Sequence, residues 1–168
     1  MLPPDHEDLE RLVYERVIRL EITGGIPTWE AFPSARHQHL IDRIRATIAP
    51  AEATAEDCGC FHLADTLFRF PDGSRKRPDI AIFCQEPPYL DEALTIIPDA
   101  VIEIVSPGYE YKDVTLNPPF YLGQGVRDVV IYDPATARLT HHTRAGATER
   151  AAPADLTLTC GCACTIPV

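Results

Sequence analysis

Long apolar runs are missing from this sequence of 168 residues, and so is a recognisable secretion signal. A membrane-spanning helix needs about 18 or more consecutive apolar residues, and no window of the sequence approaches that length. The first ten residues, MLPPDHEDLE, are acidic and have no apolar core of the kind found in a signal peptide. We therefore expect no membrane partner and a cytoplasmic location.

Positive charge is also scarce. The chain has 15 Lys and Arg against 25 Asp and Glu, a formal net charge of −10 and a pI near 4.9. Contacts with phosphates normally supply most non-specific affinity for nucleic acid, so this balance argues against a passive DNA-binding module. It argues less against a metal-dependent enzyme, because a bound cation partly neutralises an acidic site. The basic turn at 75–77 can guide a polyanion, although such turns are more often simply solvated.

Cysteine pairs of the C-x-x-C form, a strong zinc signal, are absent. In a cytosolic chain the spacings that do occur do not imply disulfides. A free cysteine is usually a small buried hydrophobe, so we favour a packing role. The alternative is a structural metal or redox role, since the C-x-C clusters contain enough thiolates for a metal. The six cysteines are Cys58, Cys60, Cys84, Cys160, Cys162 and Cys164.

Hydrophobic periodicity and turn residues predict a mixed fold. The composition is that of an ordinary globular protein, and the length suits one domain over residues 1–168 with a core of its own. Ser34 is the expected N-cap of a helix that Pro50 follows. We predict the class α/β, with a mixed α+β sheet flanked by helices. The expected elements are a helix at 5–13, a hairpin at 16–32, a helix at 35–48, strands at 61–70, 79–83 and 99–105, a helix from 117 to 123 or 125, a strand at 127–133 with a hairpin partner at 139–145, and a last strand that carries the three C-terminal cysteines.

Two carboxylates stand where core strands should be apolar. Asp79 opens the run DIAIF, and Glu103 interrupts the run VIEIV. A charge among apolar neighbours is costly unless it is paired, hydrogen-bonded or bound to a metal. If the two strands are neighbours, both side chains can meet at one end of the sheet. An Asp at a strand edge can also cap a turn, so the alternatives stay open for Asp79, whereas a functional role is favoured for Glu103.

Two hard oxygen donors with open positions suit Mg²⁺ or Mn²⁺. Such an ion can activate water and stabilise the charge that develops on a phosphate. The pattern of Asp79 and Glu103 therefore favours chemistry on a phosphodiester.

Five segments together form a specific combination. RPDIAIF and VIEIVSP occur in that order, LEITGG and PSARHQHLI precede them, and FYLGQGVRDVVIYDP follows. From about Leu20 onward the chain resembles the restriction endonuclease family of the Uma-two type, a branch of the PD-(D/E)XK nuclease superfamily. The resemblance implies a restriction-endonuclease-like fold, DNA as substrate and a homodimer, which suits the cutting of two strands.

The resemblance also implies site residues. Asp79 and Glu103 match the metal ligands of the family, Glu21 matches a third carboxylate, and His37 matches a histidine that contacts phosphate or positions water. Without the resemblance, Glu21 is equally well a solvated strand residue. His37 is equally well a histidine at the start of a helix.

The chain departs from the family at the lysine. The superfamily lysine stands two residues after the glutamate, where this chain has Val105, and the later position used within the family falls at Asn117. Asn cannot supply the positive charge of a lysine. Lys112 is the expected replacement, and Asp113 matches a family aspartate that orients the lysine.

The leading hypothesis is a Mg²⁺- or Mn²⁺-dependent DNA endonuclease in which the catalytic residues are Asp79, Glu103, Lys112, Glu21 and His37. The alternative is a catalytically weakened or inactive binding or assembly protein that keeps the nuclease fold. A third hypothesis is a cysteine-dependent metal or redox protein.

Overall fold

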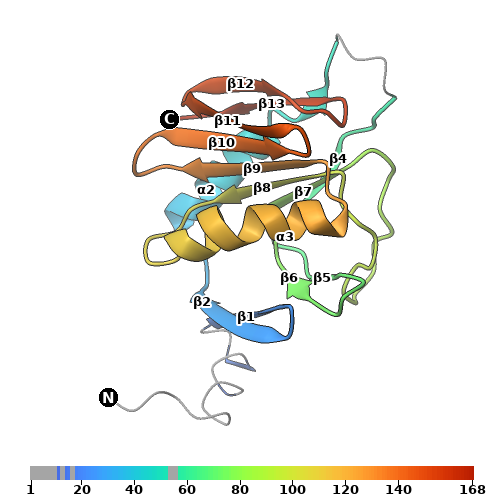
Figure 1. Ribbon diagram of the computed structural model, residues 1–168, viewed down its shortest axis with the longest axis vertical. Coiled ribbons are helices and arrows are strands. Elements are labelled where there is room, and N and C mark those ends of the chain that lie inside the picture. The colour runs from blue at the N-terminus through green and yellow to red at the C-terminus, as the bar shows by residue number, and fades with distance from the viewer. Residues whose placement is uncertain (1–10, 12–13, 16–17, 53–56) are drawn as a thin grey trace.

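The structure, a computed structural model, describes residues 11, 14–15, 18–52 and 57–168 (Figure 1). The helix expected at 5–13 falls almost entirely outside these residues. The described strands form three sheets with the orders β2-β1-β6-β5, β11-β10-β9-β8-β7-β4 and β12-β13-β3. The elements are β1 (Ile18–Thr23), β2 (Ile26–Ala31), α2 (Ala35–Arg45), β3 (Ala49–Pro50), β4 (Phe61–Ala64), β5 (Phe68–Arg69), β6 (Arg75–Lys76), β7 (Ile80–Phe83), β8 (Ala100–Ile104), the π-helix η1 (Tyr111–Leu116), α3 (Asn117–Gln124), β9 (Asp128–Asp133), β10 (Arg138–Thr143), β11 (Gly146–Ala151), β12 (Ala154–Thr157) and β13 (Cys162–Ile166).

The six-stranded sheet is the centre of the fold. Its neighbours are antiparallel except β8 and β9, which run parallel and are joined by η1 and α3. Parallel neighbours need such a crossover, because a tight turn cannot join them. In Figure 1, α3 covers one face of this sheet and α2 lies on the other. The predicted class, a mixed α+β sheet flanked by helices, is confirmed.

Alternation along the central strands divides the core in two. Ile102 and Ile104 pack on the side of α2, with the small β12-β13-β3 sheet. Val101 and Val105 pack on the side of α3, with Tyr121 of that helix. Since successive side chains of a strand point to opposite faces, Glu103 falls on the α3 side.

The helix α2 begins as the sequence predicts. The Ser34 hydroxyl accepts a hydrogen bond from the backbone N–H of His37 at 3.2 Å, the geometry of an N-cap. The buried face includes His37, Leu40 and Ile44. The helix ends at Arg45, three residues before the expected end. The cap therefore holds His37 in the first turn, facing the sheet.

The helix α3 is also confirmed. Pro118 and Pro119 lie in its first turn, where proline is tolerated. Gly125 ends it with φ 103°, a left-handed conformation that favours glycine. The preceding turn, η1, was not predicted, and it brings Lys112 and Asp113 toward the sheet.

The single strand predicted at 61–70 is wrong. The chain forms β4 and β5, which belong to different sheets. Between them Asp65 takes a φ of 51°, and its carboxylate accepts a hydrogen bond from Arg19 at 2.6 Å. The ion pair between Asp65 and Arg19 of β1 explains why the strand is interrupted here. No local sequence pattern predicts this contact.

The expectation that the cysteines form no disulfides is wrong as well. Cys58 is bonded to Cys84, and Cys60 to Cys162. Two others, Cys160 and Cys164, are free and buried, as the packing role predicts.

The described helices are too short or too polar to cross a lipid bilayer.

Candidate active site

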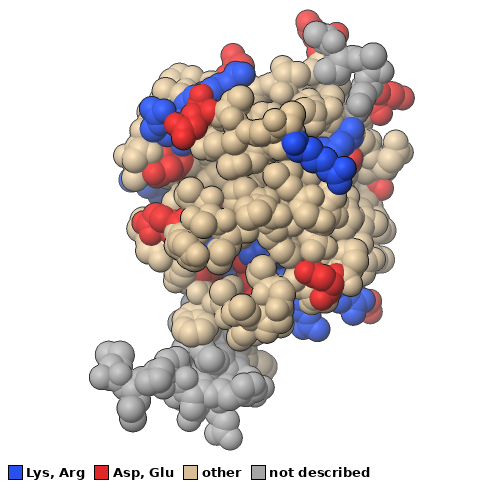
Figure 2. Space-filling view, viewed as in Figure 1, with Lys and Arg blue, Asp and Glu red and all other residues tan. Residues whose placement is uncertain are grey.

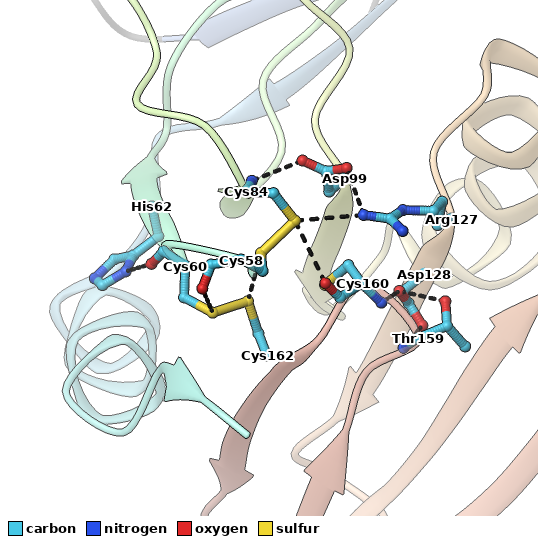
Figure 3. Close-up of a disulfide and its surroundings, with 10 residues drawn as sticks. All are labelled: Cys58, Cys60, His62, Cys84, Asp99, Arg127, Asp128, Thr159, Cys160 and Cys162. Atoms are coloured by element: carbon cyan, nitrogen blue, oxygen red, sulfur yellow. Dashed lines mark hydrogen bonds and ion pairs between the residues drawn. A yellow bond between two sulfur atoms is a disulfide. The ribbon is translucent and has the colours of Figure 1, made fainter. Parts of the chain in front are cut away.

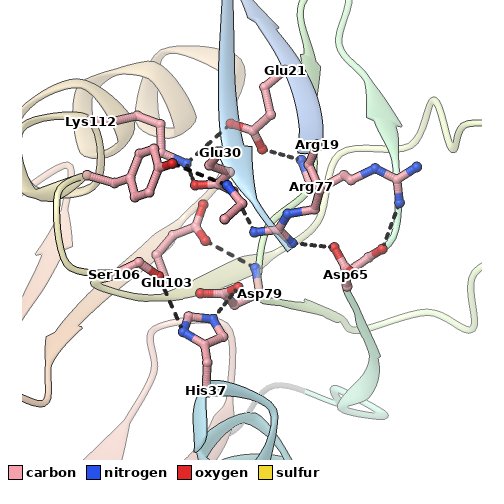
Figure 4. A network of polar contacts seen from close by, with 12 residues as sticks. Arg19, Glu21, Glu30, His37, Asp65, Arg77, Asp79, Glu103, Ser106 and Lys112 are labelled. Atoms are coloured by element: carbon pink, nitrogen blue, oxygen red, sulfur yellow. Dashed lines mark hydrogen bonds and ion pairs between the residues drawn. The ribbon is translucent and has the colours of Figure 1, made fainter. Parts of the chain in front are cut away.

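Charged side chains gather where the β1-β2 hairpin meets the end of the central sheet (Figure 4). They come from both strands of the hairpin, from β6 and β8, from α2 and from η1, and α3 adds the uncharged Asn117 and Tyr121. All five residues named as catalytic from the sequence lie here. They are Glu21, His37, Asp79, Glu103 and Lys112.

Asp79 and Glu103 lie side by side, as expected for neighbouring strands. The registry pairs Ile80 of β7 with Ile102 of β8, which places the two acidic residues next to each other at the same end. One Glu103 oxygen, Oε2, accepts the backbone N–H of Asp79 at 3.1 Å. Asp79 Oδ2 accepts the N–H of Ile104 at 2.8 Å. Both contacts join the two strands, so the Asp79 side chain bonds across the sheet here and not within its own turn.

His37 reaches the first of these carboxylates. Its Nε2 lies 2.9 Å from Asp79 Oδ1, and its Nδ1 lies 3.4 Å from the Ser106 hydroxyl. Burial alone would lower the pKa of His37, but the hydrogen bond and charge of Asp79 outweigh it and raise the pKa above its ordinary value. His37 is therefore a polar group of the site and more than a histidine that happens to start a helix.

Glu21 is buried, with 2% of its surface exposed, so it is not a solvated strand residue. Its carboxylate accepts hydrogen bonds from Lys76 Nζ at 2.7 Å and from the backbone N–H of Arg77 at 2.7 Å. Burial would raise the pKa of Glu21, but Lys76 and Lys112 hold it below its ordinary value.

Lys76 is the main residue that sequence reasoning missed. It comes from the turn at 75–77, which we expected to be solvated, yet it is fully buried. A lysine is almost never fully buried unless it is paired. Besides Glu21, its Nζ donates to Asn117 Oδ1 at 2.9 Å. The one available signal was composition, because Lys76 and Lys112 are the only lysines of the whole sequence.

Asn117 and Tyr121 of α3 connect the polar network to Glu103 of β8. Asn117 Nδ2 donates to Glu103 Oε1 at 3.3 Å, and the Tyr121 hydroxyl donates to the same oxygen at 2.8 Å. Asn117, at the position of the missing family lysine, therefore bridges Lys76 and Glu103. Burial first, and then the charge of Asp79, raise the pKa of Glu103 well above its ordinary value.

Lys112 lies in the site, as expected, but its ammonium is shared among other acids. Its Nζ is 2.8 Å from Glu30 Oε2, 3.3 Å from Asp113 Oδ1 and 3.5 Å from Glu21 Oε2. Burial would lower the pKa of Lys112, and these carboxylates together with Glu103 raise it above its ordinary value instead. Lys112 is thus a fixed positive charge in this structure.

Arg19 and Glu30 complete the hairpin side, and neither was singled out from the sequence. They stand directly opposite each other in the β1-β2 register. Arg19 donates to Glu30 at 2.5 Å and to Asp65 at 2.6 Å. Cross-strand neighbours of opposite charge are the expected source of such a pair, so the hairpin register was the signal that could have found it.

Comparisons with known proteins identify the family of this chain. A family model described as "Uma2: Putative restriction endonuclease" matches residues 5–159. The chain belongs to this family. The resemblance noted from the sequence is thereby confirmed, and the Uma2 match extends further toward the N-terminus than the motifs quoted for it.

A solved structure shares the Uma2 chain's fold. It is described as "a putative nuclease belonging to DUF820 from Anabaena variabilis ATCC 29413", and it is similar with a TM-score of 0.61 and 18% identity, over 92% of this chain and 88% of that one. At this identity the likeness supports the restriction-endonuclease-like fold and nothing finer. A comparison with curated proteins finds no match.

The donor set of the Uma2 chain fits a hard divalent cation. Among the described residues, Lys and Arg form ion pairs with Glu21 and Glu30 but not with Asp79 or Glu103. A carboxylate has about four lone-pair positions, so the two hydrogen bonds to Asp79 and the three to Glu103 leave some free. Mg²⁺ is commonly held by one or two carboxylates, with waters and phosphate oxygens as its other ligands.

A pocket of about 410 Å³ opens beside this site. It is lined by Glu30 and His37 of the network, and by Ser106 and Tyr109 of the loop before η1. Asp79 and Glu103 are not among its lining residues. His37 lines the pocket and contacts Asp79 at 2.9 Å, so this histidine connects the pocket to the carboxylate pair.

Proposed function

We propose that this Uma2-family chain is a metal-dependent DNA endonuclease that hydrolyses phosphodiester bonds. The observation that carries the proposal is the pair of buried carboxylates, Asp79 and Glu103, set side by side without a lysine or arginine partner among the described residues. Their one ion-pair partner among the described residues is His37, which contacts Asp79 alone, so two buried acids side by side stay costly when both are charged. A divalent cation that binds both would remove that cost.

In this proposal Asp79 and Glu103 hold Mg²⁺ or Mn²⁺. When bound, the ion supplies an activated water and stabilises the negative charge that develops on the phosphate. Tyr121 and Asn117 fix the orientation of Glu103 through their hydrogen bonds to Oε1. His37, which lines the pocket and contacts Asp79, is placed to contact a phosphate or hold a water.

Two lysines together replace the charge that is missing at Val105 and Asn117. Lys112 was the replacement expected from the sequence, and its Nζ is tied to Glu30 and Glu21. Lys76 contacts Asn117, and Asn117 in turn contacts Glu103. The charge of Lys76 is therefore separated from the carboxylate pair by a single side chain, that of Asn117. Glu21 contacts both ammonium groups, that of Lys76 at 2.7 Å and that of Lys112 at 3.5 Å. These roles follow from charge and contact.

The substrate side of the proposal is consistent with the charge of the chain. With a net charge of −10, the protein does not hold DNA by a general basic surface. On the face drawn in Figure 2 the basic side chains lie in separate groups, interspersed with acidic ones. We therefore expect weak affinity without a metal and metal-dependent binding of DNA. A homodimer stays a prediction from the family resemblance.

The test is nicking of supercoiled plasmid in Mg²⁺ or Mn²⁺ by the wild type and by Glu103→Gln. The matched control is Glu149→Gln, an exposed glutamate on β11 whose only described ion pair is with exposed Arg138. Loss of one metal ligand should lower the nicking rate at least about 100-fold, and the control should cut like the wild type. Equal cutting by Glu103→Gln would point to a contaminating nuclease and reject the site.

A second candidate function, a non-catalytic binding or assembly protein, is favoured by one observation. Neither lysine contacts Asp79 or Glu103 directly, and Lys112 is held by three other acids. This alternative predicts that Mn²⁺ does not raise the melting temperature, because the site no longer binds metal. A metal-dependent rise that Glu103→Gln abolishes supports the endonuclease and removes the alternative.

A further inference from the structure

Four cysteines from three distant segments meet in the core (Figure 3). Cys58 and Cys60 precede β4, Cys84 follows β7, and Cys162 opens β13. All are buried except Cys84, which is half-buried. Cys58 Sγ lies 3.4 Å from Cys162 Sγ, so the two sulfur pairs touch each other.

The sulfur atoms are grouped as metal ligands are. In the described part of the chain, groups of three or more ligand atoms that all lie within 4.8 Å of one another consist of cysteine alone. One such group is Cys58, Cys60 and Cys162, and another is Cys58, Cys84 and Cys160. Tetrahedral zinc, with Zn–S bonds of about 2.3 Å, sets its sulfurs ~3.8 Å apart. The contact between the two pairs is close to that spacing.

The surroundings suit a negatively charged centre. Arg127 Nη2 lies 3.3 Å from Cys84 Sγ and 2.8 Å from Asp99 Oδ1, and Asp99 also accepts the N–H of Cys84. A zinc ion with four thiolates has a net charge of −2, and a guanidinium at this distance stabilises it.

We propose that Cys58, Cys60, Cys84 and Cys162 form a structural zinc site when they are reduced. The disulfides of the structure are the oxidised form of the same cluster. A thiol reductant converts each disulfide to two thiols by supplying two electrons and two protons, and is itself oxidised to a disulfide. A phosphine supplies the two electrons and becomes the phosphine oxide, with water as the source of the oxygen and the two protons. Four thiols then bind one Zn²⁺ and release four protons, one from each sulfur that becomes a thiolate.

The role of this site is structural. Strand β7 begins next to Asp79 and is followed directly by Cys84, so the cluster and the carboxylates lie at opposite ends of one strand. All four positions are occupied by protein sulfur, which leaves no open place for water or substrate. The ion would fasten the start of β4, the end of β7 and the start of β13 to one another.

The experiment begins with protein purified under reductant and without chelator, and its zinc is measured by mass spectrometry. The wild type should contain about one zinc per chain, as a closed Cys₄ site requires. Cys58→Ser and Cys162→Ser should lose most of it. The matched control is Cys164→Ser, because Cys164 is buried and free but absent from both sulfur groups. Cys160 belongs to the group with Cys58 and Cys84, so a Cys160→Ser variant that loses its zinc overturns this choice of four ligands.

Because the serine variants risk misfolding, a second measurement uses the wild type alone. Reduced protein stripped of metal is titrated with Co²⁺ without oxygen, and the absorption bands of tetrahedral cobalt thiolate should saturate at about one equivalent. Zinc should then displace them. Wild type without zinc that also gives no cobalt bands overturns the proposal. Loss of zinc from Cys164→Ser to the same extent as from Cys58→Ser overturns it too.

Discussion

Replacing Lys76 with methionine is the sharpest test of the buried network. Methionine keeps the length and apolar stem of the side chain but removes the ammonium that Glu21 and Asn117 contact at 2.7 and 2.9 Å. Glu21 would remain buried with the N–H of Arg77 and the more distant Lys112. Removing one partner of a buried ion pair typically costs about 3–5 kcal/mol, because it strands the other charge.

The residual contacts of Glu21 place the expected cost at the lower end of that range, about 3 kcal/mol. For a chain of this size, 1 kcal/mol corresponds to about 2–4 °C in the melting temperature. We therefore expect Lys76→Met to lower it by roughly 9 °C. Urea unfolding followed by circular dichroism would give the same loss as a lower midpoint with an unchanged slope.

The double variant Glu21→Gln with Lys76→Met separates charge from packing. It removes both charges, so the penalty for a stranded carboxylate disappears, and it should be at least about 1 kcal/mol more stable than Lys76→Met alone. The control is Arg138→Met, which breaks an exposed ion pair and should change stability by less than about 0.5 kcal/mol. The reasoning fails if Lys76→Met unfolds like the wild type, or if the double variant is the least stable.

Two further predictions concern stability away from the carboxylate pair. Asp128 is fully buried and accepts hydrogen bonds from His141, from the N–H and hydroxyl of Thr159 and from the N–H of Cys160. Burial would raise the pKa of Asp128, but these donors, His141 first, hold it below its ordinary value. Its contribution to stability is therefore present above the unfolded pKa, near 3.9, and is lost as the pH falls through the lower folded value. Urea titrations between pH 3 and 7 should show a smaller acid loss in Asp128→Asn, which should also cost about 2–4 kcal/mol at neutral pH; equal acid losses would contradict the assignment. Ser34→Ala removes the N-cap of α2 and should cost about 1 kcal/mol, with Ser34→Thr as the control that keeps the cap and a midpoint shift in urea as the measurement. If both variants unfold alike, the cap does not stabilise the helix.

Sequence reasoning succeeded where a signal is local. The glycine turn predicted the hairpin that carries Glu21, whereas Glu21 itself was singled out by the family resemblance. Ser34 predicted the start of α2, and the two prolines with Gly125 predicted α3, because caps and turns act within a few residues. Asp79 and Glu103 were singled out as charges in apolar strands, and their meeting was expected only if the two strands, 24 residues apart, are neighbours.

It failed where the cause lies far along the chain. The break at Asp65 depends on Arg19, which is 46 residues away. The burial of Lys76 depends on partners from β1 and α3. The disulfide partners are separated by 26 and 102 residues. No local pattern specifies such contacts, since tertiary packing decides them.

Because the sequence has only two lysines, the protein offers few side-chain amines to chemical labelling. Its two lysines are both engaged in the same buried network, one fully enclosed and the other with 15% of its side chain exposed. An acylating reagent for primary amines should therefore leave the side chains of the folded protein nearly untouched. Any loosening of the hairpin from η1 would expose Lys112 first. The rate at which Lys112 is labelled would therefore measure how often the site opens.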